Sequence, residues 1–356
     1  MKNAWNMYKK FIIIFFVFIY ISLGQIPINS CGIILSAPGE YVLTQDLVGL
    51  DLIPNSLPFN CIVISGNNIT LSGEGHNISG AFQVAVIYVE PGGFHDITIR
   101  DINIFNSLAG GITINAIGNY PLGQLPLTNF VHILNVNILS GCEPIWIMGC
   151  KGCSVINSTI YPYPNATQFA DSGMLLDGNT QLTIIGNIVN SGFYTAALEF
   201  VDLTNGANVH NNILFGGRFA GGIGTVYNGD LIHSHIYHNQ IISNFFVPGV
   251  GTTGTGLGIY WTHWGGVSEL NEYLGDMGIE FFDNVIEENT INAPFCLFFP
   301  NANDTISSTT LPMWNGNNGP VGITSGPAYA WVYDNKVRQN ICSDGTNGSI
   351  TFIGNK

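Results

Sequence analysis

The sequence predicts an all-β protein that folds as a single-stranded right-handed parallel β-helix, a solenoid with an N-terminal cap and two long loops. Three observations predict this fold: a six-residue phrase recurs along the chain, an Asn returns at its fourth position, and the composition combines 44 Gly residues with only 9% charged residues. No stretch shows the apolar period of about 3.6 residues that marks an amphipathic helix, so we expect little helix.

The phrase has the pattern apolar–x–x–(often Asn)–x–apolar and occurs eight times. The copies are 99–104 (IRDINI), 133–138 (ILNVNI), 155–160 (VINSTI), 184–189 (IIGNIV), 209–214 (VHNNIL), 236–241 (IYHNQI), 286–291 (IEENTI) and 332–337 (VYDNKV). Successive fourth positions are 34, 22, 29, 25, 27, 50 and 46 residues apart. One coil of a β-solenoid takes roughly 20 to 30 residues, so the two longest steps indicate a long loop or a skipped coil.

Each position of the phrase has a physical reason. The first and sixth residues end one strand and begin the next, and both point inward, so stacked coils bury a column of Ile, Val and Leu. The fourth residue lies at the corner between the strands, where an Asn tolerates a bent backbone and its amide can bond to the coils above and below. The Asn residues at this position are Asn187, Asn212, Asn239, Asn289 and Asn335. The alternative is an antiparallel β-sandwich, which has no need of such an Asn.

The first 24 residues are typical of a secretory signal peptide. Lys2, Lys9 and Lys10 are followed by an apolar run at 11–23, and small residues stand before Gln25. An uncleaved membrane anchor is the alternative, although the run is shorter than the roughly 20 residues of a membrane span. We expect a secreted or cell-surface protein without a transmembrane segment in the mature chain. Its net charge, 6 − 23 = −17, excludes nucleic acid as a partner.

The remaining chain divides into a capping segment at 25–60 and the β-helix at 61–356. Two insertions, at about 245–277 and 299–329, form the predicted long loops. Loops that leave a rigid scaffold commonly carry binding residues. The chain ends in SITFIGNK without a polar cap, so the last coil could self-assemble with another copy or bind another surface protein.

The mature chain has seven Cys residues, which indicate disulfides in an exported protein. We expect Cys31 and Cys61 to bridge the cap to the first coil. Cys150 and Cys153 have the spacing of a zinc-ligand pair, but no second pair accompanies them. Six sequons are open to glycosylation: Asn68, Asn77, Asn157, Asn165, Asn303 and Asn347.

The stretches CGIILSAPGEYVLTQDL and CIVISGNNITLSGEGHNISG resemble the first coil of secreted right-handed β-helix proteins, which include the NosD-type and pectate-lyase-like proteins. The resemblance implies a fold and leaves the activity open, because members include polysaccharide lyases, hydrolases, epimerases, copper-site maturation proteins and surface proteins. The chain lacks the Asn-Thr-Asp, Asp-Asp, Gly-His-Gly and Arg-Ile-Lys motifs of polygalacturonase-like enzymes. Ca²⁺ and copper are the cofactors that these relatives suggest.

Three groups of residues could carry chemistry. Carboxylates on successive coils could act as a catalytic pair in glycoside hydrolysis, and their alternative is a solvated outer face; these are Asp177, Glu199, Asp202 and Asp230. Imidazoles could bind Cu²⁺ or Zn²⁺ if the coils align them; these are His210, His233 and His235. Aromatic residues of the first loop could stack on sugar rings or pack onto the solenoid; these are Tyr260, Trp261, His263 and Trp264.

The sequence therefore supports three hypotheses of function. The first is a secreted or surface β-helix with a structural or glycan-binding role and an extracellular polysaccharide as its ligand. The second is a carbohydrate-active enzyme, a polysaccharide lyase, hydrolase or epimerase. The third is a copper-binding protein of the cell envelope. The missing catalytic motifs favour the first.

Overall fold

The computed structural model describes most of the N-terminal two thirds of the chain and shorter pieces beyond it. The described residues are 24–49, 60–80, 82, 84–107, 110–114, 128–140, 143–162, 172–190, 196–201, 204–215, 221–226, 231–242, 245–246, 259–261, 277–282, 284–287, 290–291, 295–298, 304–307, 329–333, 336–338, 341–342 and 349–352. Most of the two predicted loops and nearly all of the predicted signal peptide lie outside them. In this part of the chain no helix has the length and apolarity of a membrane span.

The described strands form three long sheets in which almost every neighbouring pair is parallel. Sheet A holds β1 (Ile26–Ile28), β3 (Gly39–Leu43), β6 (Ile69–Ser72), β9 (His95–Arg100), β12 (Thr128–Leu134), β15 (Cys150–Lys151), β16 (Ser154–Ile156), β19 (Thr183–Ile185), β22 (Thr204–Asn205), β23 (Asn208–His210), β26 (Leu231–Ile232), β27 (His235–Tyr237), β31 (Met277–Phe282), β35 (Asp304–Ser307) and β36 (Tyr329–Tyr333). Sheet B holds β2 (Ile33–Leu35), β5 (Asn60–Ile64), β8 (Ala85–Val89), β11 (Gly110–Ile114), β14 (Ile145–Met148), β18 (Met174–Asp177), β21 (Ala196–Val201), β25 (Gly221–Val226) and β30 (Ile259–Trp261).

Sheet C holds β4 (Leu47–Gly49), β7 (Asn77–Gly80), β10 (Asn103–Ser107), β13 (Asn137–Ser140), β17 (Thr159–Pro162), β20 (Ile188–Asn190), β24 (Ile213–Phe215), β28 (Gln240–Ile242), β32 (Val285–Glu287) and β37 (Lys336–Arg338). Two small sheets hold β29 (Phe245–Phe246), β33 (Thr290–Ile291) and β38 (Ile341–Cys342), and β34 (Phe295–Phe298) with β39 (Ser349–Phe352). The antiparallel exception is the pairing of β35 with β36.

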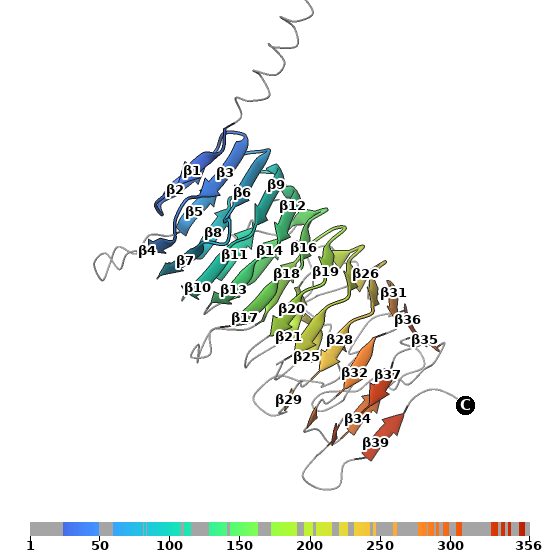
Figure 1. The fold of residues 1–356 in the computed structure, drawn as a ribbon. Helices are drawn as coiled ribbons and strands as arrows, with labels where there is room; N and C mark the ends of the chain where they lie inside the picture. The colour runs from blue at the N-terminus through green and yellow to red at the C-terminus, as the bar shows by residue number, and fades with distance from the viewer. Residues whose placement is uncertain are drawn as a thin grey trace, which may run out of the picture.

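Each coil runs through sheet A, then sheet C, then sheet B, as β6, β7 and β8 do before β9 begins the next coil. Figure 1 shows the coils stacked along one axis, with the chain passing from blue to red down the stack. The predicted right-handed parallel β-helix is confirmed.

The core is the column structure that the phrase predicts. In the six copies from IRDINI to IYHNQI the first residue is buried in sheet A and the sixth in sheet C. The strand register places each of them against its equivalent in the next coil, as with Ile133 on Val155 and Ile138 on Ile160. Each buried aliphatic side chain contributes about 1.5 to 3 kcal/mol through removal from water. Sheet B closes the core with its own inward column, which includes Ile87, Ile112 and Ile145.

A ladder of buried Asn side chains joins the later coils at the corner between sheets A and C. The Asn187 backbone N–H donates to Asn212 Oδ1 at 2.9 Å, and the Asn212 N–H donates to Asn239 Oδ1 at 3.0 Å. The side-chain amide of Asn212 also donates to Ile184 O in the preceding coil, at 2.9 Å. The ladder reaches Asn284, whose Oδ1 accepts from the Asn239 N–H at 2.9 Å. The predicted contacts to the coils above and below are confirmed for Asn187, Asn212 and Asn239.

The prediction for the seventh copy of the phrase is wrong by five residues. Asn284, and not Asn289, continues the ladder, and Ile286 pairs with Ile241 as the last residue of its phrase. The local sequence FFDNVI fits the pattern as well as IEENTI does, and the pairing of Phe281 with Ile236 selects it. Asn289 and Asn335 themselves lie outside the described residues, although Val332 and Val337 take the predicted positions beside Phe281 and Ile286.

The N-terminal segment continues the sheets as a first coil. Strands β2, β3 and β4 pair in parallel with β5, β6 and β7. The predicted disulfide between Cys31 and Cys61 is present, with a sequence separation of 30, and links this coil to β5. That the segment shields the apolar end of the stack stays a prediction.

Replacement of Asn212 by Ala should destabilise the β-helix by about 3 kcal/mol, because the change leaves the buried N–H of Asn187 and the carbonyl of Ile184 without their partner. Chemical denaturation followed by circular dichroism measures the effect. Asn205→Ala is the matched control, since Asn205 is exposed and its backbone makes the hydrogen bonds with Asn179 and Gln181. Equal stability of the two variants would contradict a stabilising role for the ladder.

Candidate functional site

A polar groove lies along the corner between sheets A and C in the first half of the stack. Its volume is about 440 Å³, and it crosses four consecutive coils. The lining residues are Glu74, Gly75, Asp101, Asn103, Asn135, Val136, Asn137, Asn157 and Thr159. Three steps of about 4.8 Å between coils give the groove a length of about 14 Å along the solenoid axis.

The turn geometry explains why this corner is polar. Asp101, Asn135 and Asn157 have left-handed φ angles of 55°, 52° and 51°, a conformation that Asn and Asp tolerate better than most residues. They are the third residues of their phrases. The fifth residues, Asn103, Asn137 and Thr159, stand in register on the outer face of sheet C. The coil repeat therefore places two rows of polar side chains side by side.

Hydrogen bonds hold the first part of this groove in place. Asn135 Nδ2 donates to Asp101 Oδ1 at 2.6 Å, and Asn103 Nδ2 donates to the Gly75 carbonyl at 2.7 Å. The second oxygen of Asp101 lies 3.5 Å from Arg100 Nη1. Arg100 also bonds to Glu40 through Nη2 at 3.0 Å, so two carboxylates share its charge. The groove wall is thus fixed before any ligand arrives.

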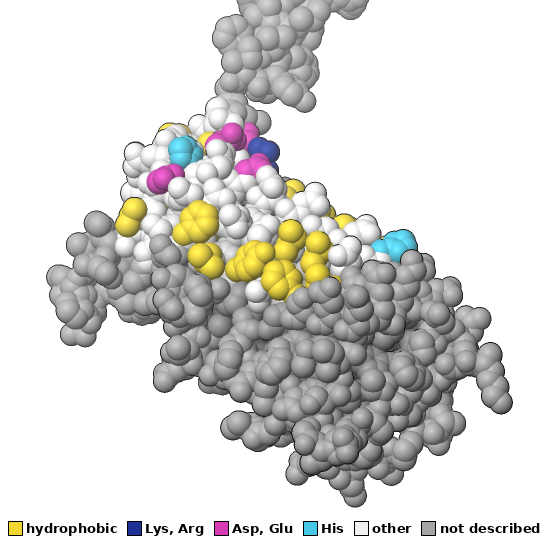
Figure 2. Space-filling view, turned by 60° about the horizontal axis from the view of Figure 1, so that its bottom comes forward, with side chains coloured by type: hydrophobic (Ala, Val, Ile, Leu, Met, Phe, Trp, Pro, Cys, Tyr) yellow, Lys and Arg dark blue, Asp and Glu magenta, His cyan; other side chains and the backbone are white. Residues whose placement is uncertain are grey.

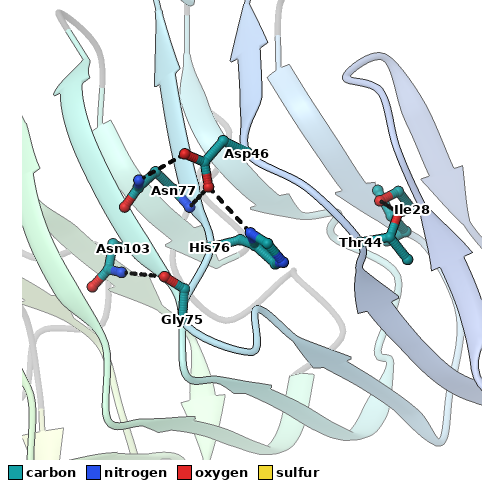
Figure 3. A network of polar contacts seen from close by, with 7 residues as sticks. All are labelled: Ile28, Thr44, Asp46, Gly75, His76, Asn77 and Asn103. Carbon is teal, nitrogen blue, oxygen red and sulfur yellow. Dashed lines mark hydrogen bonds and ion pairs between the residues drawn. The ribbon is translucent and has the colours of Figure 1, made fainter.

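A second polar network adjoins the groove at its N-terminal end (Figure 3). Asp46, just before β4, accepts bonds from the backbone N–H and the side-chain amide of Asn77, both at 2.9 Å, and lies 3.2 Å from His76 Nδ1. These bonds, led by the one from the Asn77 backbone, lower the pKa of the Asp46 carboxyl. Through His76 and Asn77, the network holds the turn that carries Glu74 and Gly75 against the preceding coil.

Hydrophobic side chains form a band on the outer face of sheet C, beside the groove. They are Val48, Phe105, Leu139, Tyr161, Phe215 and Ile242. Phe105, Leu139 and Tyr161 each stand two residues beyond the groove residues Asn103, Asn137 and Thr159, on the same face. Figure 2 shows hydrophobic side chains gathered on this face. The rings of Tyr161 and Phe215 meet edge to face at 5.8 Å.

Two of the predicted catalytic carboxylates share the outer face of sheet B. Asp177 is 9% exposed and Glu199 is 4% exposed, while their neighbours Leu176, Leu198 and Phe200 fill the core. Leu175 pairs with Glu199, so the two acidic residues lie on adjacent strands and two residues apart along them. Their Cα atoms are then about 8 Å apart, from a strand spacing of about 4.8 Å and a rise of about 3.3 Å per residue. Asp202 and Asp230 lie outside the described residues.

Tyr260 occupies the same register column as Glu199. Gly224 pairs with Glu199 on one side and with Tyr260 on the other. Trp261 follows Tyr260 in β30 and pairs with Thr225. His263 and Trp264 lie outside the described residues, so the aromatic group stays a prediction, although its first strand belongs to the sheet that carries Asp177 and Glu199.

The structure does not bring His210, His233 and His235 together as a metal site. His210 pairs with Tyr237 on the next coil, and the two rings stack with centroids 4.7 Å apart. Tyr237 stacks on Phe282 at 4.9 Å, so the three rings form a ladder outside sheet A. Burial, and then the nearby His238, lower the pKa of His210. Within the described part of the chain no three His, Cys, Asp or Glu residues are placed to hold a metal ion.

The remaining predicted residues are the second cysteine pair and the six sequon asparagines. Cys150 and Cys153 are paired as a second disulfide within the buried core, which agrees with the preference for disulfides over a zinc pair. Asn68 is exposed, Asn157 lines the groove, and the side-chain amide of Asn77 bonds to Asp46. The sequons at Asn165, Asn303 and Asn347 lie outside the described residues, and glycosylation stays a prediction at all six.

Sequence reasoning missed the groove. Its signal is present in the phrase, because polar residues recur at the third position (Asp101, Asn135, Asn157) and at the fifth (Asn103, Asn137, Thr159).

The chain matches no protein-family model, and no curated protein is similar to it at a significant level. Among solved structures, the Dettilon tailspike protein gp208 matches with 12% identity and a TM-score of 0.44, over 75% of this chain and 54% of that chain. Tailspike protein 3 of bacteriophage CBA120 matches with 13% identity and a TM-score of 0.38, over 74% and 52%. The A-module of the mannuronan C-5 epimerase AlgE6 from Azotobacter vinelandii matches with 13% identity and a TM-score of 0.36, over 90% and 91%. The chain thus spans about half the length of the two tailspike chains.

Proposed function

We propose that this protein is a secreted or cell-surface β-helix that binds an extracellular glycan along the polar groove. The observation that carries the proposal is the arrangement on sheet C, where the amide and hydroxyl groups of Asn103, Asn137 and Thr159 stand beside Phe105, Leu139 and Tyr161. Export agrees with the disulfide between Cys31 and Cys61, a bond that persists outside reducing compartments.

A sugar chain fits both parts of this surface. Its hydroxyl groups donate and accept hydrogen bonds, and Asn side chains can do the same in return. The apolar faces of its rings suit aromatic and aliphatic side chains. Because the coils repeat, a glycan that runs parallel to the solenoid axis meets similar polar groups at each coil over about 14 Å. We therefore expect the ligand to be an oligosaccharide or a stretch of a polysaccharide.

Replacement of Asn137 by Ala, in the middle of the groove, should weaken glycan binding about fivefold, the equivalent of one lost hydrogen bond. The measurement is calorimetric titration of the purified protein with oligosaccharides chosen by an initial screen of neutral and uronic-acid polysaccharides. Asn205→Ala, on the outer face of sheet A, is the matched control and should bind as the unmodified protein does. Absence of binding to every glycan, or equal affinity of the two variants, would refute the proposal.

A second candidate function is hydrolysis of a glycan on sheet B. It is favoured by the position of Asp177 and Glu199, two nearly buried carboxylates on adjacent strands of one outer face. Glycoside hydrolysis uses one carboxylic acid to protonate the leaving oxygen and a second carboxylate to activate water or attack the sugar, at separations of roughly 5 to 9.5 Å. The metal-binding hypothesis has no comparable support among the described residues.

Hydrolysis would make Glu199→Gln and Asp177→Asn each at least about 100-fold slower than the unmodified protein, because each removes an acid or base without changing its size. New reducing ends released from the screened polysaccharides measure the rate. Glu90→Gln, directly after β8 of the same sheet, is the control and should keep full activity. If no polysaccharide yields reducing ends, or the variants match the control, the binding function stands alone.

A further inference from the structure

We infer that the groove selects uncharged glycans over polyuronates, because two carboxylates and no basic side chain line its described walls. This inference rests on the proposed glycan-binding function and names the class of glycan. The residues that set this selectivity are Glu74 and Asp101.

The charge of the groove is negative at its N-terminal half. Glu74 and Asp101 both line it, on consecutive coils. Arg100 lies next to Asp101, but its guanidinium is held between Asp101 and Glu40, so one cation faces two carboxylates. The positive charge of Arg100 is therefore already neutralised by these two carboxylates. The carboxylate of Glu74 adds a further negative charge to the groove. The chain as a whole carries a formal net charge of −14, which offers no long-range attraction to a polyanion.

The hydrogen-bonding groups of the groove match hydroxyl groups. A carboxylate only accepts hydrogen bonds, and a sugar hydroxyl donates one. Bonds to an ionised acceptor are roughly twice as strong as those between neutral groups. Neutral sugars thus satisfy Glu74 and Asp101, whereas a uronate carboxylate at the same place brings a third acceptor and a like charge.

The positions of the two carboxylates are fixed, which makes the selection a property of the free protein. Ser72 Oγ donates to Glu74 Oε1 at 3.0 Å, and Asn135 Nδ2 donates to Asp101 Oδ1. Neither carboxylate can swing away from an approaching anion without losing one of these bonds. The carboxylates of a bound polyuronate would therefore be repelled by the fixed negative charges of Glu74 and Asp101.

The test compares the affinities of the unmodified protein for neutral and uronic-acid oligosaccharides of equal length at low ionic strength, with and without added CaCl₂. We expect the neutral series to bind at least tenfold more tightly in both conditions. Asp101→Asn and Glu74→Gln together should narrow the preference at least threefold, and Asn at 101 is compatible with the left-handed backbone there. Asp96→Asn is the matched control, since Asp96 also has a left-handed φ of 56° and lies outside the groove lining, and it should keep the preference.

Equal or tighter binding of the uronic-acid series, with or without Ca²⁺, would overturn the inference. If Asn137→Ala also weakens that binding, the groove is still the glycan site and only its selectivity is wrong. If no glycan of either series binds, the proposed function fails and the inference fails with it. A double variant that keeps the full preference for neutral glycans would also overturn the inference, because the carboxylates would then not be its cause.

Discussion

The buried Asn ladder is the constraint on which the rest of this structure depends. Each ladder residue places its side-chain oxygen on the backbone N–H of the preceding coil and donates its amide to a carbonyl there, as Asn212 does with Asn187 and Ile184. These groups are excluded from water, so a slip of one residue would leave several of them unpaired at about 1 to 3 kcal/mol each. Aliphatic columns alone would resist such a slip less specifically, because Ile, Val and Leu can replace one another with small losses.

A fixed register has consequences on the outside of the solenoid. Residues that occupy equivalent positions in successive phrases become neighbours about 4.8 Å apart, whatever their distance in sequence. The rows of Asp101 with Asn135 and of Asn103 with Asn137 line the groove for this reason, and the band of Phe105, Leu139 and Tyr161 follows the same rule. On sheet B the same register pairs Glu199 with Leu175, so Glu199 lies on the strand next to the one that carries Asp177. The sequence repeat therefore determines which surface side chains lie next to one another.

The inward half of the molecule could be predicted from the sequence because the apolar phrase and its Asn repeat at recognisable intervals. The disulfide of Cys31 with Cys61 could be predicted separately, from the cysteines of an exported chain. Asn284 was missed because two overlapping segments fit the phrase and only pairing with β27 selects one of them. The three His residues could have approached one another, but His233 lies in a turn with a φ of 48°, and His235 pairs with Asn208 while His210 pairs with Tyr237. The groove required knowledge of which turn residues face solvent, and spacing alone does not supply it.

Hydrogen exchange at the ladder amides tests the central claim most directly. The backbone N–H groups of Ser158, Asn187, Asn212 and Asn239 each donate to the side chain of an Asn in the next coil. The account predicts that these four amides exchange as slowly as those of the buried strands, because opening any of them requires the coils to separate. Exchange at the rate of unprotected amides would show that the side chains do not hold the coils in register.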